Sequence, residues 1–339
     1  MNNILSEFIN EMDLLKLYIE FQNESYKNQS KIERLKEDSK YDILTTAKIK
    51  QFDFNSHIIS IYGAFEHFIE QIFSKYLKDI SLISKSFDTL PIEIQNNNLT
   101  KTLDILKQLD YRKNKNLKPE KLIEILHNNI NLNAPTLNIE AFKNHNANFR
   151  IAIIDNYFAE IGIKNLSSLI RQYEPLKKYL EDSITDYSSK KSNIIFQILE
   201  IICDLRNDIA HGVQSIQLIN KNILFEYIEF IKIFAITLCE FISDVYLNNV
   251  FSTLNEEIEI LNVFNNNILC FNTKGQVISK DTIIIAYSEN HFPKYFKLQI
   301  SEIQHNGLSI QNTTLNHKID IGIKVNNKIK SNMTFKILK

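Results

Sequence analysis

The sequence predicts an α+β protein, in which a mainly α-helical bundle is followed by a small antiparallel β domain. Over residues 1–255, apolar residues recur every three or four positions in long windows. Over residues 256–339, short β-branched runs alternate with turn signals. The 339 residues include only six Gly and five Pro, which favours long helices. We therefore expect two domains, an α-helical domain at 1–255 and a β-rich domain at 256–339.

The helical part begins with an apolar stripe at 4–21, followed by a longer one at 42–82, in which we expect a break near Asp53. Prolines then separate shorter helical patterns. Two strong helices complete the bundle, at 191–211 and at 218–249. The shorter patterns cover residues 99–109, 119–130, 138–143 and 148–161.

The β-rich part contains five short runs bounded by Asn, Gly and Lys residues. The pair Asn306-Gly307, flanked by Ile303 and Leu308, is a hairpin signal, because both central positions of a tight hairpin turn need positive φ. Counting weaker runs as well, we expect five to seven antiparallel strands. The five clear runs are 268–271, 282–287, 296–303, 308–311 and 319–325.

Charge excludes a globally basic nucleic-acid coat, since 39 Lys and Arg face 40 Asp and Glu. A local basic patch remains, because residues 101–121 hold seven basic residues against three acids. Basic and aromatic side chains together can contact a phosphate backbone and stack a base. Lys113, Lys115 and Tyr111 are therefore candidate RNA contacts. The alternative is a solvated lysine-rich loop.

Cysteine usage indicates a cytoplasmic protein. Cys203, Cys239 and Cys270 lie in apolar stretches and form no CxxC pair, which is typical of buried thiols in a reducing compartment. No Cys/His cluster has zinc spacing, so we expect no metal and no cofactor. The N-terminus is acidic, unlike a signal peptide, and the most apolar helical stretch, 230–247, carries three charges, so no membrane association is expected.

The segment LEIICDLRNDIAHGVQ, at 199–214, is the part that indicates chemistry. Its apolar spacing predicts a packed helix. Asn207 and His211 are four residues apart and share one helix face, while Asp208 lies three residues before His211. Gly212 suits the position just past a helix end, which places His211 at or near that end.

An arginine beside a titrating imidazole is the pair that RNA cleavage without a metal requires. Arg206 could hold a phosphate through its planar fork. His211 could take the proton of a 2′-hydroxyl that attacks the adjacent phosphorus, and a second histidine could protonate the leaving oxygen. In the alternative, His211 is only a cation at a helix C-terminus, and Arg206 pairs with Asp204 or Glu200.

The run RNDIAH at 206–211 resembles the R-x(4–6)-H motif of the HEPN superfamily. Two more segments, IYGAFEHFI at 61–69 and the stretch 148–163, are similar to segments of its prokaryotic branch that includes the MAE-type and RiboL-PSP-HEPN-like proteins. The resemblance covers about residues 40–250 and implies an all-α bundle, commonly dimeric. Many such domains are metal-independent ribonucleases of toxin–antitoxin, abortive-infection and CRISPR-associated systems.

Carried onto this chain, the resemblance implies that Arg206 and His211 form the catalytic pair, with the motif helix at about 191–212. Asn207 and Asp208 would support them, and Glu66 would add a carboxylate from an early helix. Glu66 has an alternative as an ordinary residue of an amphipathic helix. In HEPN dimers the two motif helices meet, so that a shared cleft holds two Arg and two His.

The leading hypothesis is a homodimeric, metal-independent endoribonuclease that acts as a toxin or antiviral effector on RNA, with tRNA loops among its substrates. A cognate antitoxin or an activator protein would restrain it. The alternative is a non-catalytic HEPN module that binds RNA or a partner protein. A third reading, a helical scaffold unrelated to RNA, agrees with the near-neutral net charge.

Overall fold

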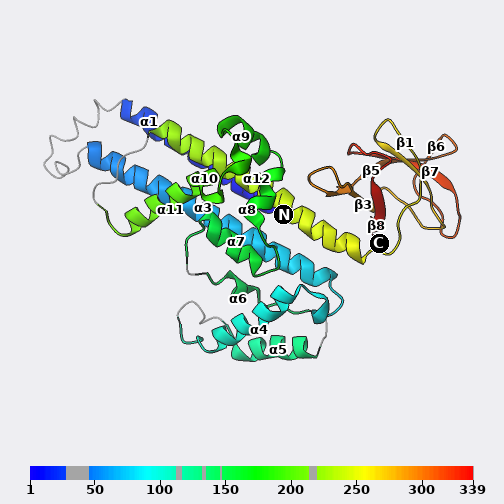
Figure 1. Cartoon of the computed structure of the whole chain (residues 1–339), viewed down its shortest axis with the longest axis horizontal. Helices are drawn as coiled ribbons and strands as arrows, with labels where there is room; N and C mark the ends of the chain where they lie inside the picture. The colour runs from blue at the N-terminus through cyan, green and yellow to red at the C-terminus, as the bar shows by residue number, and fades with distance from the viewer. Residues whose placement is uncertain (28–45, 112–116, 132–134, 146, 214–219, 339) are drawn as a thin grey trace. The chain divides into compact units, whose positions relative to one another are not determined.

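The computed structural model describes residues 1–27, 46–111, 117–131, 135–145, 147–213 and 220–338 (Figure 1). Contacts within the chain divide it into two compact units, Met1–Cys239 and Glu240–Lys339. Secondary structure changes from helix to strand between Thr253 and Ile260. The α+β class is confirmed, with helices before this point and antiparallel strands after it. A domain boundary at 255/256 stays a prediction.

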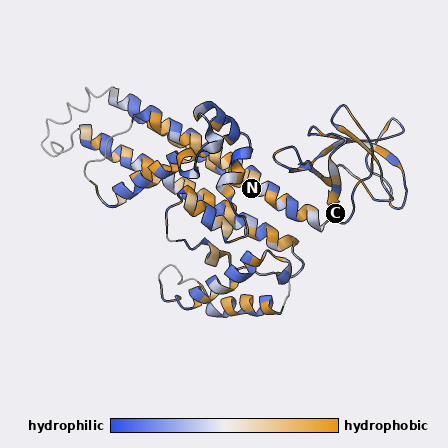
Figure 2. Cartoon of the chain, viewed as in Figure 1, coloured by the Kyte–Doolittle hydropathy of each residue, from blue (hydrophilic) through white to orange (hydrophobic). Residues whose placement is uncertain are grey.

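Helices account for most of the described residues before 254, and the long ones carry alternating hydrophilic and hydrophobic bands (Figure 2). Such bands are what one buried face and one solvated face require. In the described ranges no helix is both long and apolar enough to cross a membrane. The α-helices are α1 (Asn2–Lys27), α3 (Thr46–Ile83), α4 (Ile92–Leu106), α5 (Pro119–Ile130), α6 (Ile139–Lys143), α7 (Ile151–Ala159), α8 (Leu166–Leu169), α9 (Leu176–Ser183), α10 (Ser192–Ile195), α11 (Gln197–Ala210) and α12 (Lys221–Thr253), with 3₁₀ turns η3 (Phe87–Thr89), η5 (Ile170–Gln172) and η6 (Tyr187–Ser189).

Aromatic rings from distant helices form the core of the first unit. α1 packs along α3, where the rings of Phe8 and Phe68 lie 4.6 Å apart between centroids. Phe65 of α3 meets Phe234 of α12 at 5.8 Å. Phe73 of α3 stacks on Tyr157 of α7 at 3.9 Å. Burial of these large side chains, together with the many buried Ile and Leu residues around them, stabilises the bundle.

Two helical expectations were wrong. The helix expected at 191–211 is interrupted at Phe196, whose backbone (φ −100°, ψ 28°) is not helical, so that α10 and α11 are separate. The Phe196 ring is fully buried against Phe230 and Phe234, and this packing outweighs one helical turn. The break expected near Asp53 is absent, because Asp53 lies partly exposed on the continuous helix α3.

The strands form two antiparallel sheets that share one hydrophobic core. The five-stranded sheet has the order β1-β2-β7-β5-β6, and the three-stranded sheet has the order β4-β3-β8. Residues of both sheets, such as Leu269 and Phe335, are fully buried in the common core. The strands are β1 (Ile260–Phe264), β2 (Ile268–Asn272), β3 (Ile283–Tyr287), β4 (Tyr295–Leu298), β5 (Ile300–His305), β6 (Leu308–Ile310), β7 (Asp320–Val325) and β8 (Thr334–Leu338).

The described part of this region has eight strands rather than the expected five to seven. The run expected as one strand at 296–303 divides at Gln299 into β4 and β5, which belong to different sheets. Gln299 exchanges bonds with Asn326, from Gln299 N to Asn326 Oδ1 at 3.0 Å and from Asn326 N to Gln299 O at 3.3 Å. Leu298 and Ile300 are both buried in the shared core, so the chain changes sheets without exposing apolar surface.

Candidate active site at the end of helix α11

Helix α11 ends in the way that the sequence predicts. The last helical residue is Ala210, and His211 is the C-cap, with φ −88° and ψ 3°; the N–H of His211 donates to Asn207 O at 2.9 Å. Gly212 follows with φ +70°. The N–H groups of Gly212 and Val213 donate to Ile209 O at 3.1 Å and to Asp208 O at 3.0 Å. This is the bond pattern of a Schellman ending, which needs a left-handed residue after the last helical one.

Arg206 lies one and a half turns before this end, on the side of α11 that meets α3. The guanidinium carbon is 5.5 Å from the centroid of the Tyr62 ring, and Nη1 lies 3.4 Å from Asn207 Oδ1. Within the described residues it forms no ion pair with a carboxylate. Arg206 is therefore a partly buried cation whose charge is not neutralised by the surrounding side chains described.

The carboxylates of Glu200 and Asp204, the partners considered for Arg206, form ion pairs with Arg150 instead. Arg150 Nη1 donates to Glu200 Oε2 at 2.9 Å, and Nη2 donates to Asp204 Oδ1 at 2.5 Å. The hydrogen bonds to Asp204 and Glu200 raise the pKa of Arg150. The alternative in which Arg206 pairs with Asp204 or Glu200 is therefore wrong. Arg150 ties the start of α7 to α11 and leaves Arg206 without these partners.

A series of hydrogen bonds connects Asn207 to side chains outside α11. Asn148 Nδ2 donates to Asn207 Oδ1 at 2.5 Å. The single hydroxyl proton of Tyr62 has two acceptors in reach, Glu66 Oε1 at 2.9 Å and Asn148 Oδ1 at 3.3 Å. The Tyr62 oxygen in turn accepts the N–H of Phe149 at 3.1 Å. Burial and the neighbouring Glu66 raise the pKa of Tyr62, so it stays a neutral donor.

This chain of bonds shows where the structure places Glu66. It lies on α3, one bond from Tyr62, and reaches Asn207 only through Tyr62 and Asn148. Sequence reasoning missed Tyr62 and Asn148 as site residues. The only signals were that Tyr62 precedes Glu66 by four residues, one helical turn, and that Asn148 opens the segment similar to the HEPN family.

A surface cavity of about 440 Å³ lies beside Arg206, and its lining is Ala147, Asn148, Arg150, Ile153, Arg206 and Asn207. The structure thus brings Arg206 and Asn207 to one cavity. His211 and Asp208 are exposed and do not line it. Among the described residues the imidazole of His211 has no hydrogen bond or ion pair. Within one chain, Arg206 therefore lines the cavity, whereas His211 lies at the end of α11. Because His211 follows Asn207 by four residues, the two lie on the same face of the helix.

Cys203 lies behind this site, buried in α11. Burial raises the pKa of its thiol to about 12, so the sulfur stays protonated and is not a nucleophile. No disulfide joins it to Cys239 or Cys270. In the described part of the chain, no group of three or more His, Cys, Asp and Glu side chains is placed to hold a metal ion.

Of the candidate RNA contacts at 111–115, Tyr111 is described by the structure, and it does not line the cavity beside Arg206. Tyr111 follows α4 and is 59% exposed, whereas Lys113 and Lys115 lie outside the described residues. Figure 1 shows α4 and α11 at separate places in the bundle. A role of these three residues in RNA binding stays a prediction.

The helical bundle, with an arginine and a histidine set five residues apart at the end of one packed helix, defines the class as a HEPN-type module. The family model described as RiboL-PSP-HEPN matches residues 23–244, more than half of the chain. The chain therefore belongs to the RiboL-PSP-HEPN family, which is nuclease- and RNA-related. No curated protein matches it. The match includes all residues of the site and stops before the strands.

Proposed function

We propose that the protein is a metal-independent endoribonuclease of HEPN type, with Arg206 and His211 of two chains acting in a cleft of a homodimer. The observation that carries this proposal is the state of Arg206. It lines a cavity with no carboxylate partner among the described residues, while Arg150 beside it holds both Glu200 and Asp204. A half-buried cation without a counter-charge is suited to an anion from outside the chain, and an RNA phosphate is such an anion.

The reaction divides between the two side chains. An imidazole of His211 removes the proton of a ribose 2′-hydroxyl, and that oxygen forms a bond to the adjacent phosphorus. Arg206 stabilises the charge that develops on the non-bridging oxygens. The bond from phosphorus to the 5′ oxygen breaks, and a protonated imidazole supplies the proton that the 5′ oxygen needs. The products are a 2′,3′-cyclic phosphate and a 5′-hydroxyl.

A dimer supplies the second histidine that the motif of one chain lacks. The acid and the base must be separate groups, but the motif of one chain contains a single histidine. His211 is exposed at the end of α11, where an imidazole of a second copy can approach the same phosphate. Asn148, Tyr62 and Glu66 hold Asn207 in place beside the cavity, which limits the freedom of the Arg206 fork.

The wider role that we propose is that of a toxin or antiviral-defence effector acting on RNA in the cytoplasm, with tRNA among its substrates. A nuclease of this kind requires restraint, so we also propose a cognate antitoxin or an activator protein as partner. Family membership supports the nuclease-related part of this role.

The test is incubation of the purified protein with total RNA in EDTA. We expect products that end in a 2′,3′-cyclic phosphate, and loss of these products in His211→Ala and in Arg206→Ala. His317→Ala, which removes an exposed histidine of the β-rich region, is the matched control and should keep full activity. Identical RNA patterns from wild type and His211→Ala, where wild type cleaves, would reject the catalytic role.

Mixing wild type with His211→Ala tests the shared cleft. A mixed dimer of one wild-type and one His211→Ala chain keeps both arginines but only one imidazole, whereas the reaction needs a separate acid and base. If the imidazoles of two chains act in one cleft, an excess of His211→Ala chains lowers the activity of a fixed amount of wild type. If each chain acts alone, the added variant leaves the wild-type activity unchanged.

A second candidate is a non-catalytic HEPN module that binds RNA or a partner protein. It is favoured by the position of His211, which does not line the cavity that holds Arg206. In that case the wild type leaves RNA intact with and without EDTA, while Arg206→Ala weakens RNA binding.

A further inference from the structure

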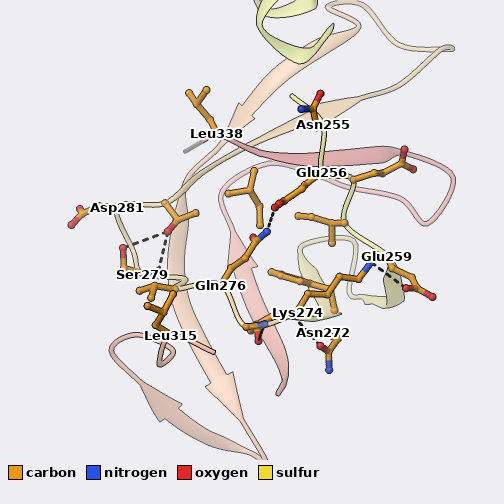
Figure 3. Close-up of a pocket in the computed structure, with 18 residues that line it drawn as sticks. Asn255, Glu256, Glu259, Asn272, Lys274, Gln276, Ser279, Asp281, Leu315 and Leu338 are labelled. Atoms are coloured by element: carbon orange, nitrogen blue, oxygen red, sulfur yellow. Dashed lines mark hydrogen bonds and ion pairs between the residues drawn. The ribbon is translucent and has the colours of Figure 1, made fainter. Parts of the chain in front are cut away.

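The β-rich unit contains a larger cavity, of about 820 Å³, that the proposed ribonuclease function does not use (Figure 3). Four parts of this unit form it: the chain between α12 and β1, the end of β2 with the loop after it, the segment between β6 and β7 that contains Leu315, and the end of β8. Its volume lies in the range of sites that enclose a ligand or several side chains of a peptide.

The base of this cavity is apolar. Ile258, Phe271 and Ile337 line it and are at least nine-tenths buried. At the rim, Val277 and Leu315 remain 47% and 62% exposed. An occupant that covered these two side chains would remove apolar surface from water, which is favourable.

Carboxylates surround this apolar base. Four line the cavity, against one ammonium group, that of Lys274, which pairs with Glu259 at 3.4 Å. The Gln276 amide donates to the carboxylate of Glu256, as Figure 3 shows. The formal charge of the described lining residues is therefore −3. The four acidic residues are Glu256, Glu257, Glu259 and Asp281.

This charge does not follow the composition of the region. Residues 256–339 contain ten Lys and seven Asp or Glu, a net positive segment. Four of those seven acids nevertheless line the cavity, and of the nine lysines that the structure describes in this segment only Lys274 does. The acids therefore gather at a hollow of a lysine-rich segment, and this arrangement is complementary in charge to a cation.

We propose that this cavity binds a basic peptide segment of a partner protein, one that carries Lys or Arg side chains next to apolar ones. Long cationic side chains place their methylene stems on apolar surface and their charged heads at a rim, and this rim carries carboxylates. RNA does not fit, because its phosphates would face three excess negative charges. The inference is independent of ribonuclease activity.

The experiment measures binding of fluorescein-labelled hexapeptides to the full-length protein by fluorescence anisotropy. The probe alternates leucine with lysine and arginine, and its partner alternates leucine with glutamate and aspartate. We expect only the basic probe to bind. In the double variant E257Q/D281N, its affinity should fall about fivefold to tenfold, the effect of removing two partly exposed ion pairs. The double variant E289Q/E302Q removes two acids outside this cavity and should bind as wild type does.

A third variant separates shape from charge. Leu315→Ser changes an exposed rim residue, so folding is preserved, and we expect about a threefold weaker affinity from the lost apolar contact. RNA cleavage should be unchanged in E257Q/D281N. Four outcomes overturn the proposal: no binding of the basic probe, equal losses in the two double variants, spermidine binding as tightly as the peptide, or RNA fragments displacing the peptide from the cavity.

Discussion

Asn148 donates a hydrogen bond of 2.5 Å to Oδ1 of Asn207, across 59 positions of the sequence. That same oxygen lies 3.4 Å from Nη1 of Arg206. The bond therefore fixes the Asn207 carboxamide in the orientation that turns its oxygen toward the guanidinium. It links the segment before α7 to the motif helix α11, so the position of the arginine depends on residues outside the motif.

Asn148 is accordingly expected to act as a positioning residue. Asn148→Ala should lower kcat about tenfold with a smaller change in KM, because the phosphate is still bound but less well oriented. Its free energy of unfolding should fall by about 1 kcal/mol, the typical effect of one lost hydrogen bond. Asn156→Ala, an exposed asparagine of α7, is the matched control. Equal kcat in both variants would contradict the role.

Replacing Arg206 by lysine separates charge from geometry. Arg206→Lys keeps a cation but loses the planar fork, and we expect kcat/KM to fall about 10²-fold to 10³-fold, as for other lost transition-state donors. No carboxylate among the described residues pairs with Arg206. The free energy of unfolding of the variant should therefore lie within about 0.5 kcal/mol of the wild-type value. Steady-state cleavage of a defined RNA and urea denaturation measure the two quantities. Full activity in the lysine variant would show that the fork is not used.

The local parts of this structure were predictable from sequence. The helix expected at 119–130 is α5 (Pro119–Ile130), and the positive φ of Gly212 follows from its place after the last apolar turn of α11. Local periodicity and capping depend on neighbours within one or two turns, and a single sequence contains that information.

The contacts between distant residues were not predictable. Arg150 forms ion pairs with Glu200 and Asp204, which lie 50 and 54 positions further along the sequence. Tyr62 contacts Asn148, which lies 86 positions away. Nothing local distinguishes these partners from other charged or polar residues of the bundle. The interruption at Phe196 likewise results from two rings of α12. The site was therefore predicted as an arginine and a histidine, without the network that holds them.

Protonation of a buried histidine should reduce stability in mild acid. His57 of α3 is 6% exposed, its ring lies 5.9 Å from that of Tyr18, and burial lowers its pKa despite Asp53. A folded pKa below the unfolded value of 6.5 means that the unfolded chain binds the proton more tightly. The stabilisation is complete above that pH and is lost as the pH falls from 6.5 through the folded pKa.

His57→Leu removes this titration, so the free energy of unfolding of wild type should fall relative to that of the variant below about pH 6.5, by at most about 1.4 kcal/mol per pH unit. Urea denaturation of both proteins at a series of pH values measures the difference, in which the groups common to both cancel. Parallel pH profiles would show that His57 contributes nothing to the acid sensitivity.

Two glycines near the site should respond in opposite ways to the same substitution. Gly212 has φ +70°, and a Cβ there would meet no atom within 4 Å, so the cost of Gly212→Ala is the left-handed backbone alone, about 1 kcal/mol. Gly63 lies inside α3 and is also open to a Cβ. Gly63→Ala should raise the free energy of unfolding by about 0.5–1 kcal/mol, because alanine loses less backbone entropy in a helix. Urea denaturation of both variants at one protein concentration measures the pair. Destabilisation by Gly63→Ala would mean that another surface, such as a second copy of the chain, covers this position of α3.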